Sequence, residues 1–283
     1  MEFHLSDEQK MFYEQALKFF RREVAPHAEE SDDKHQFCWE AWRKMGEQGF
    51  IGLHLPEEYG GSGADVLTTC MAHEAAGRAG VDGGFTLSWG AHTFLTMDTL
   101  HKWGNEEQRK KYVPKLATGE WVGAMGLTEP NAGSDAAGLE TTAVRKGDKY
   151  ILNGTKMFIT NGPIADVLVI YATVDKNLKH QGITGFIVEK DMPGYSVGKE
   201  LNKMCCRSST TGELVFDDCE VPVENRLGDE GAGFMMALGT VEWDRSALLA
   251  PMVGTTEFML EQCVRYAKER HQFGRPIASF PAI

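Results

Sequence analysis

The chain has 283 residues, of which 42% are hydrophobic and 25% are charged, the balance of a globular protein built from two or three units. Lysine and arginine together number 29 against 41 aspartates and glutamates, so the formal net charge is -12. This acidic balance argues against nucleic acid as a partner, because nucleic-acid binding depends on a basic surface.

The first part of the chain carries helical patterns. Ser6 and Gln9 form a capping-box pair, and apolar residues then recur at helical spacing until Pro26. A turn-rich segment surrounds Tyr59. Further helices are predicted over 38–48, 66–77, 85–103 and 105–116, the last capped by Asn105. We therefore predict an all-α N-terminal domain over residues 1–120.

From Trp121 the period of the apolar residues changes to two. Strands are predicted over 122–127, 141–146, 149–156, 167–173, 185–189 and 211–221, separated by short turns that are typical of antiparallel hairpins. A middle domain over 121–231 is expected to be an antiparallel β-barrel or sandwich. Helical spacing returns at Gly233, so residues 232–283 are expected to begin a C-terminal helical bundle. The predicted class is α+β and multidomain.

Two segments of the middle domain suit a flat ligand with several hydrogen-bond acceptors. WVGAMGLTEPNAGSD, at 121–135, reads as a strand that opens into a loop with hydroxyls at Thr128 and Ser134. LNGTKMFITNG, at 152–162, places Phe158 and Thr160 two residues apart, on one side of a strand. An aromatic face with two hydroxyls fits an isoalloxazine ring. The patterns L-T-E-P-x-A-G-S-D and N-G-x-K-x-F-I-T-N-G resemble the flavin-binding core of the acyl-CoA dehydrogenase family.

The resemblance implies that FAD is the cofactor, and it assigns residues to it. Two of them depart from common family members, because Phe158 stands where tryptophan is frequent and Met125 where a larger residue is frequent. Ser134 is also implied to contact the pantetheine arm of the substrate. The implied FAD contacts from these segments are Met125, Leu127, Thr128, Gly133, Ser134, Phe158 and Thr160.

The segment ERHQFG, at 269–274, resembles the family's E-R-x-x-F-G signature. In relatives the arginine pairs with the flavin pyrophosphate across a subunit interface, a role that suits a bidentate guanidinium. The resemblance thus implies FAD contacts from Arg270, Gln272 and Phe273, and a homo-oligomer, either a dimer or a homotetramer.

The segment VEWDRSALLAP, at 241–251, bears on the catalytic base. In the isovaleryl- and long-chain-type branches of the family the base immediately precedes the arginine, which is the position of Asp244. In many other members the base is a glutamate further along the chain. Asp244 as a structural acid, paired with Arg245 or capping a helix, is the alternative. Glu242 and Arg245 match positions that line the acyl-CoA cleft in relatives.

The implied function is oxidative fatty acid metabolism by a flavoprotein oxidoreductase. A carboxylate removes the α proton of an acyl-CoA thioester, the β hydrogen passes as hydride to flavin N5, and the electrons go to an electron-transferring flavoprotein. Two alternatives stay open. Because family members continue past Ile283 with more helices, the chain could be C-terminally truncated, a non-catalytic subunit or an incomplete fragment of a heteromeric complex. An oxygen-using oxidase or monooxygenase would keep the same fold.

Other patterns are predicted to be structural. The six cysteines have no metal-ligand spacing, so no metal site is expected and the thiols suit a reducing compartment. No secretory signal or apolar run of about 20 residues occurs, which predicts a cytoplasmic protein without a membrane span, or a mitochondrial matrix one if a leader has been removed. Arg207, Ser208 and Ser209 are expected to form a structural hydrogen-bonding cluster. The bulky Trp89, His92 and Phe94 hint at a short, branched or cyclic acyl group.

Overall fold

The computed structural model describes residues 4–281 and begins with a group of helices. The predicted capping box is present, because Gln9 N–H donates to Ser6 Oγ at 3.1 Å and Ser6 N–H donates to Gln9 Oε1 at 3.0 Å. Asn105 and Gln108 form a second one. The helices are α1 (Asp7–Glu23), α2 (Ala28–Lys34), α3 (Trp39–Glu47), α4 (Val66–Ala79), α5 (Gly83–Gly90), α6 (Asp98–Trp103) and α7 (Glu106–Ala117).

The helix predicted over 85–103 is continuous but not uniform. Between α5 and α6 the segment Ala91–Met97 is a π-helix, a geometry that often lies at functional sites. Its His92 is completely buried and joins the helices to the first strand. His92 Nε2–H donates to Leu116 O at 3.0 Å, and His92 Nδ1 accepts from Gly123 N–H at 3.0 Å. His92 is therefore a neutral core residue.

The middle region is one strongly bent sheet with the order β6-β7-β3-β2-β4-β5-β8, and β1 pairs with β4 in parallel. Within residues 4–281 this path does not close from β6 to β8, so a closed barrel is wrong, and the sheet is not purely antiparallel. The bend encloses a core that includes Tyr150, Leu168 and Phe186. The strands are β1 (Gly123–Gly126), β2 (Thr142–Lys146), β3 (Lys149–Thr160), β4 (Val167–Thr173), β5 (Ile183–Glu189), β6 (Tyr195–Glu200), β7 (Thr211–Pro222) and β8 (Arg226–Leu227).

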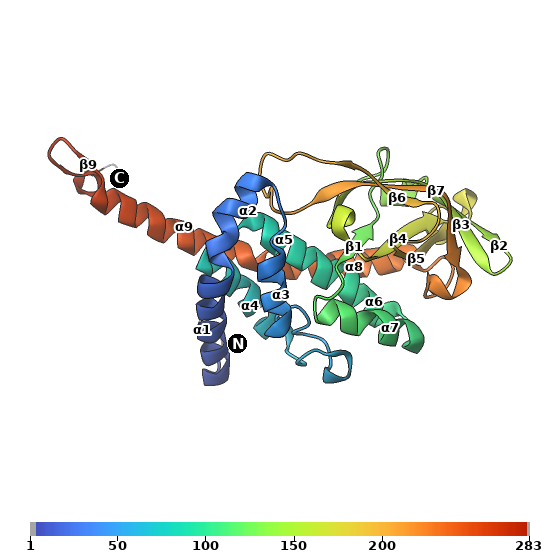
Figure 1. Ribbon diagram of the computed structural model, residues 1–283, viewed down its shortest axis with the longest axis horizontal. Helices are drawn as coiled ribbons and strands as arrows, with labels where there is room; N and C mark the ends of the chain where they lie inside the picture. The colour runs from blue at the N-terminus through green and yellow to red at the C-terminus, as the bar shows by residue number, and fades with distance from the viewer. Residues whose placement is uncertain (1–3, 282–283) are drawn as a thin grey trace.

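Two further helices, α8 (Gly233–Ala247) and α9 (Ala250–Glu269), follow the sheet. Figure 1 shows β1 to β7 gathered at one end of the molecule and α9 extending toward the opposite end. A hairpin of β9 (His271–Gln272) and β10 (Arg275–Pro276) lies beyond α9. The expected order of helices, strands and helices is thus confirmed. None of the helices in residues 4–281 has the length and apolar character that crossing a bilayer requires.

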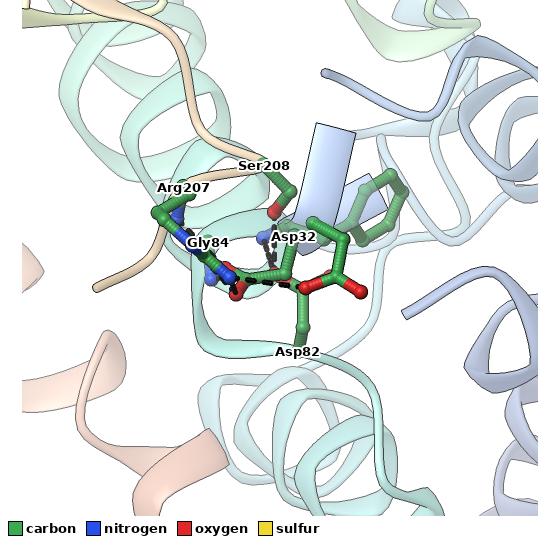
Figure 2. Close-up of polar contacts among 7 residues, drawn as sticks. Asp32, Asp82, Gly84, Arg207 and Ser208 are labelled. Carbon is green, nitrogen blue, oxygen red and sulfur yellow. Dashed lines mark hydrogen bonds and ion pairs between the residues drawn. The ribbon is translucent and has the colours of Figure 1, made fainter. Parts of the chain in front are cut away.

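The loop before β7 is tied to the helices by the predicted polar cluster, shown in Figure 2. Arg207 donates from its backbone N–H and guanidinium to the carboxylate of Asp32 at 2.7–3.0 Å. Ser208 donates to Asp82, which also accepts from Gly84 N–H at the start of α5. The cluster holds residues 207–208 against α2 and α5, so its structural role is confirmed.

Glycines allow α4 and α9 to cross with their backbones in contact. A Cβ built on Gly77 would lie 2.0 Å from Pro251 O, and one on Gly254 would lie 2.0 Å from Glu74 O. Gly77→Ala must therefore push the helices apart, and we expect it to lower the free energy of unfolding by about 1–3 kcal/mol. Gly239→Ala is the control, since its Cβ meets open space on α8 and is expected to be neutral or stabilising. Chemical denaturation of both variants measures the difference, and equal stabilities would contradict the crossing.

Candidate functional site

Two hollows meet between the sheet and α8. The larger, here called the cleft, has a volume of about 620 Å³, and the second, the small cavity, has about 190 Å³. Leu127 and Val241 line both, so the two hollows adjoin. The cleft is lined by Leu127, Gly133, Ser134, Ala136, Phe234, Ala237, Leu238, Val241, Glu242, Arg245 and Ser246. The small cavity is lined by Ala91, Leu95, Met125, Leu127, Thr128, Phe158, Ile159, Thr160 and Val241.

One wall comes from the ends of β1 and β3. The pairing of β3 with β7 is irregular between Lys156 and Ile159, and Phe158 there has a φ of 61°. A positive φ is strained for a bulky residue, and such strain gathers at functional sites. As a result Phe158 is 62% exposed, an open aromatic face beside the hydroxyls of Thr128 and Thr160.

The opposite wall is one face of α8. Phe234, Leu238, Val241 and Arg245 recur at intervals of three or four residues, so their side chains point to the same side of the helix. The other side of α8 packs on the helical domain, where Thr240 and Thr99 share a hydrogen bond of 2.7 Å. The cleft therefore lies where the sheet and the helices are held together.

Asp244 follows Thr240 by one turn of α8, on the side that packs toward the helical domain. It does not line the cleft, although Glu242 and Arg245 do. Its Oδ1 is buried without a hydrogen-bond partner, and no ion pair of Asp244 occurs among residues 4–281. Burial raises the pKa of Asp244 to about 6, against the lowering effect of Arg245. The structural alternative, an aspartate neutralised by pairing with Arg245, is therefore not what the described residues show.

The structure brings most of the residues assigned from the motifs to these two hollows, while their roles stay predictions. Gly133 and Ser134 lie in the cleft with Glu242 and Arg245. Five others line the small cavity, namely Met125, Leu127, Thr128, Phe158 and Thr160.

Arg270, Gln272 and Phe273 are not brought to the cleft within this chain. They are exposed at the hairpin end of α9, which Figure 1 shows at the far end of the molecule from the sheet, and Phe273 is 92% exposed. Within residues 4–281 they line neither the cleft nor the small cavity.

Several lining residues escaped the sequence analysis. Ala91 and Leu95 lie one helical turn apart in the π-helical segment and line the small cavity. Their bulkier neighbours Trp89, His92 and Phe94 are instead buried and line neither hollow, so their effect on the acyl group stays a prediction. In the sequence, only the helical periodicity of residues 85–103 could have distinguished the residues that line the cavity from those that are buried in the core. Within residues 4–281 no group of three His, Cys, Asp or Glu side chains could hold a metal ion.

Three family models match the chain in order. They describe the N-terminal domain of acyl-CoA dehydrogenases over residues 6–120, the middle domain over 124–219 and the C-terminal domain over 231–283.

Individual proteins match over the same length. An acyl-CoA dehydrogenase of Bacillus subtilis is 44% identical over 280 residues, which are 99% of this chain and 73% of that protein. Butyryl-CoA dehydrogenase from Megasphaera elsdenii is 40% identical with a TM-score of 0.93, covering 100% of this chain and 74% of that one. A chain in the structure of the electron transferring flavoprotein of Acidaminococcus fermentans is 47% identical, with a TM-score of 0.95 and the same coverage. The chain thus spans about three quarters of the length of these relatives.

Proposed function

The chain belongs to the acyl-CoA dehydrogenase family of oxidoreductases, and from that premise we propose that it removes the α proton and β hydride of an acyl-CoA thioester. One observation carries the proposal. A half-buried carboxylate with a raised pKa, Asp244, lies on α8 between Val241 and Arg245, which line the cleft. A carboxylate poised near neutral pH suits general-base chemistry.

FAD is the cofactor of this family, and the small cavity is the proposed place for its ring. The open face of Phe158 offers an apolar surface for a planar ring, while Thr128 and Thr160 offer hydroxyls at its edge. Met125 and Leu127 would hold the other side. When bound, FAD supplies the acceptor for the β-hydride. Arg270, Gln272 and Phe273 would reach the cofactor of a partner copy in a dimer or tetramer.

The cleft is proposed to hold the thioester and its pantetheine arm. Its volume of about 620 Å³ is typical of a small-molecule site, and its mostly apolar wall from α8 carries polar groups only at Glu242, Arg245 and Ser246. Ser134 enters from the opposite loop. These groups would orient the substrate so that its α carbon faces Asp244, whose carboxylate takes the proton. The electrons would leave to an electron-transferring flavoprotein.

An anaerobic titration tests the proposal. The FAD-loaded chain is mixed with a panel of acyl-CoA thioesters while the visible absorbance of the oxidised flavin is recorded. Loss of that absorbance with one thioester is the expected result. Bound flavin that no thioester reduces would instead favour a non-catalytic subunit or incomplete fragment. Rapid reoxidation by oxygen after reduction would favour an oxidase.

Arg245→Ala is expected to weaken thioester binding more than it slows the reaction. Arg245 lines the cleft and can make a charge-assisted hydrogen bond, which contributes about 1.5–3 kcal/mol, or roughly ten- to a hundredfold in affinity. The measurement is the thioester concentration dependence of flavin reduction. Arg265→Ala, on the exposed side of α9, is the control and should change neither constant. An unchanged affinity in Arg245→Ala would remove Arg245 from the binding site.

A further inference from the structure

A lysine and a glutamate form a completely buried ion pair directly behind the small cavity. Lys156 has no exposed surface, and its Nζ lies 2.6 Å from Glu129 Oε1 and 3.2 Å from Leu127 O. Glu129 is itself only 5% exposed. Lysine and glutamate are almost never fully buried unless they are paired, so this pair needs an explanation in the architecture.

Glu129 organises the loop that follows β1. Its Oε2 accepts from Glu140 N–H at 2.5 Å and its Oε1 accepts from Thr141 N–H at 3.0 Å. Its own N–H and C=O are paired with Ala132, which closes the tight turn between them. One carboxylate thus holds both ends of the loop 129–141.

Lys156 joins that loop to β3. Its ammonium reaches the loop through Glu129 and through Leu127 O, and the next residue, Met157, donates its N–H to Thr128 O at 2.8 Å. Leu127 and Thr128 line the small cavity on one side, and Phe158 lines it from the other. The pair is therefore one or two residues away from both walls.

We propose that Lys156 and Glu129 are a positioning pair that fixes the distance between the β1 loop and the bulge of β3, and so sets the shape of the FAD and thioester site. The inference rests on the proposed function. Neither residue lines the cleft or the small cavity, so the pair acts through Leu127, Thr128, Ser134 and Phe158.

Both members are charged near neutral pH. Burial lowers the pKa of Lys156 to about 8, while Glu129 acts to raise it and is the charged group that faces the ammonium. Burial acts to raise the pKa of Glu129, but the charge of Lys156 and its hydrogen bonds hold it below the usual value. A neutral residue at either position would leave the other as an uncompensated buried charge.

Lys156→Met and Glu129→Gln test the proposal, with Lys149→Met as the matched control. Lys149 begins the same strand and pairs with Glu220 at the same 2.6 Å, but both members of that pair are exposed, at 38% and 46%. The readouts are the FAD dissociation constant from flavin fluorescence, the visible circular dichroism of bound FAD, and amide hydrogen exchange of residues 127–141 in FAD-free protein.

We expect both variants of the pair to weaken FAD binding by about tenfold or more, equivalent to about 1.4 kcal/mol, and to change the circular dichroism of bound FAD. Amide hydrogen exchange of residues 127–141 should become faster, while the amides of β4 should stay protected from exchange. The double variant should be no weaker than the worse single one, because the two residues act as one unit. Lys149→Met should match the wild type in all three readouts.

FAD binding and circular dichroism like those of the wild type in both variants would overturn the proposal. If Lys156→Met does not fold, Glu129→Gln answers the same question, because it keeps the size of the side chain. If the wild-type chain binds no FAD, the proposed function fails, and hydrogen exchange alone then decides whether the pair holds the loop. Unchanged exchange in that case would overturn the inference as well.

Discussion

Asp244→Asn is expected to slow reduction of the flavin by the preferred acyl-CoA thioester by on the order of 100- to 10,000-fold, the range for loss of a general base. Asparagine has nearly the size of aspartate but cannot accept the α proton. Because asparagine keeps the size and polarity of the side chain, binding of the thioester and of FAD should change little. Anaerobic stopped-flow measurement of the limiting rate separates the two effects.

Two other variants sharpen this test. Asp244→Glu keeps a carboxylate on a side chain that is one methylene longer, and it should retain most of the rate. Glu242→Gln, two residues away on the same helix, removes a carboxylate that lines the cleft, and it should alter thioester affinity more than the limiting rate. An Asp244→Asn protein that reduces its flavin at the wild-type rate would show that the base lies elsewhere.

The pH dependence of the limiting rate follows from the same carboxyl group. Burial raises the pKa of Asp244 to about 6, and only the deprotonated form can accept a proton. The rate should therefore rise with pH through about 6 and level off above it. Asp244→Asn should lack this step.

The two segments that line the small cavity could be located from sequence because their geometry is local. The positions of Thr128 and Phe158 each depend on one strand and the turn next to it, so a short sequence pattern is enough to predict them. The bulge that exposes Phe158 is not local, since it arises where β3 loses register with β7 over fifty residues later in the chain. Alternation of side chains along the strand therefore located the residue but not its strained φ.

The buried environment of Asp244 could not be predicted from the sequence either, because it depends on how α8 packs against distant segments. A pattern places it beside Arg245, and neighbours of opposite charge suggest a pair, but residues at i and i+1 on a helix do not face each other. The packing of α8 between the cleft and the helical domain decides which side of the helix is buried. The same packing turns Ala91 and Leu95, rather than Phe94, toward the small cavity.

Two larger features could not be predicted from the sequence. These are whether the sheet closes into a barrel and where the C-terminal hairpin lies. Short strands with close turns occur in barrels and in open bent sheets alike, and the choice depends on whether the first and last strands meet. Arg270 and Phe273 were assigned to the cofactor by resemblance, yet α9 carries them away from the cleft of their own chain. The motif predicts that these residues contact a cofactor, but it does not say which chain binds that cofactor.

Acid is expected to destabilise the fold through its buried histidines. Burial lowers the pKa of His92 to about 4 and that of His73 to about 3, so the folded chain holds both rings neutral. The unfolded chain takes up their protons near pH 6.5. The neutral rings thus contribute their full stability above pH 6.5, and this is lost as the pH falls through that value toward the folded pKa. For His92 the loss at pH 5 is about 2 kcal/mol.

His92→Phe isolates this contribution, because it removes the titrating group while keeping an apolar ring. The variant should be less stable at neutral pH, since Leu116 O and Gly123 N–H lose their partner, but its stability should fall less steeply between pH 7 and pH 5. Asp82 and Asp244, whose pKa values burial raises, act in the opposite direction and are present in both proteins, so they cancel in the comparison. His271→Gln, at an exposed position in the hairpin, is the control for loss of an imidazole. Urea unfolding across this pH range gives the slopes. Identical slopes for His92→Phe and the wild type would mean that His92 takes up its proton at the same pH in the folded and the unfolded chain, which would contradict a buried neutral ring that accepts from Gly123 N–H.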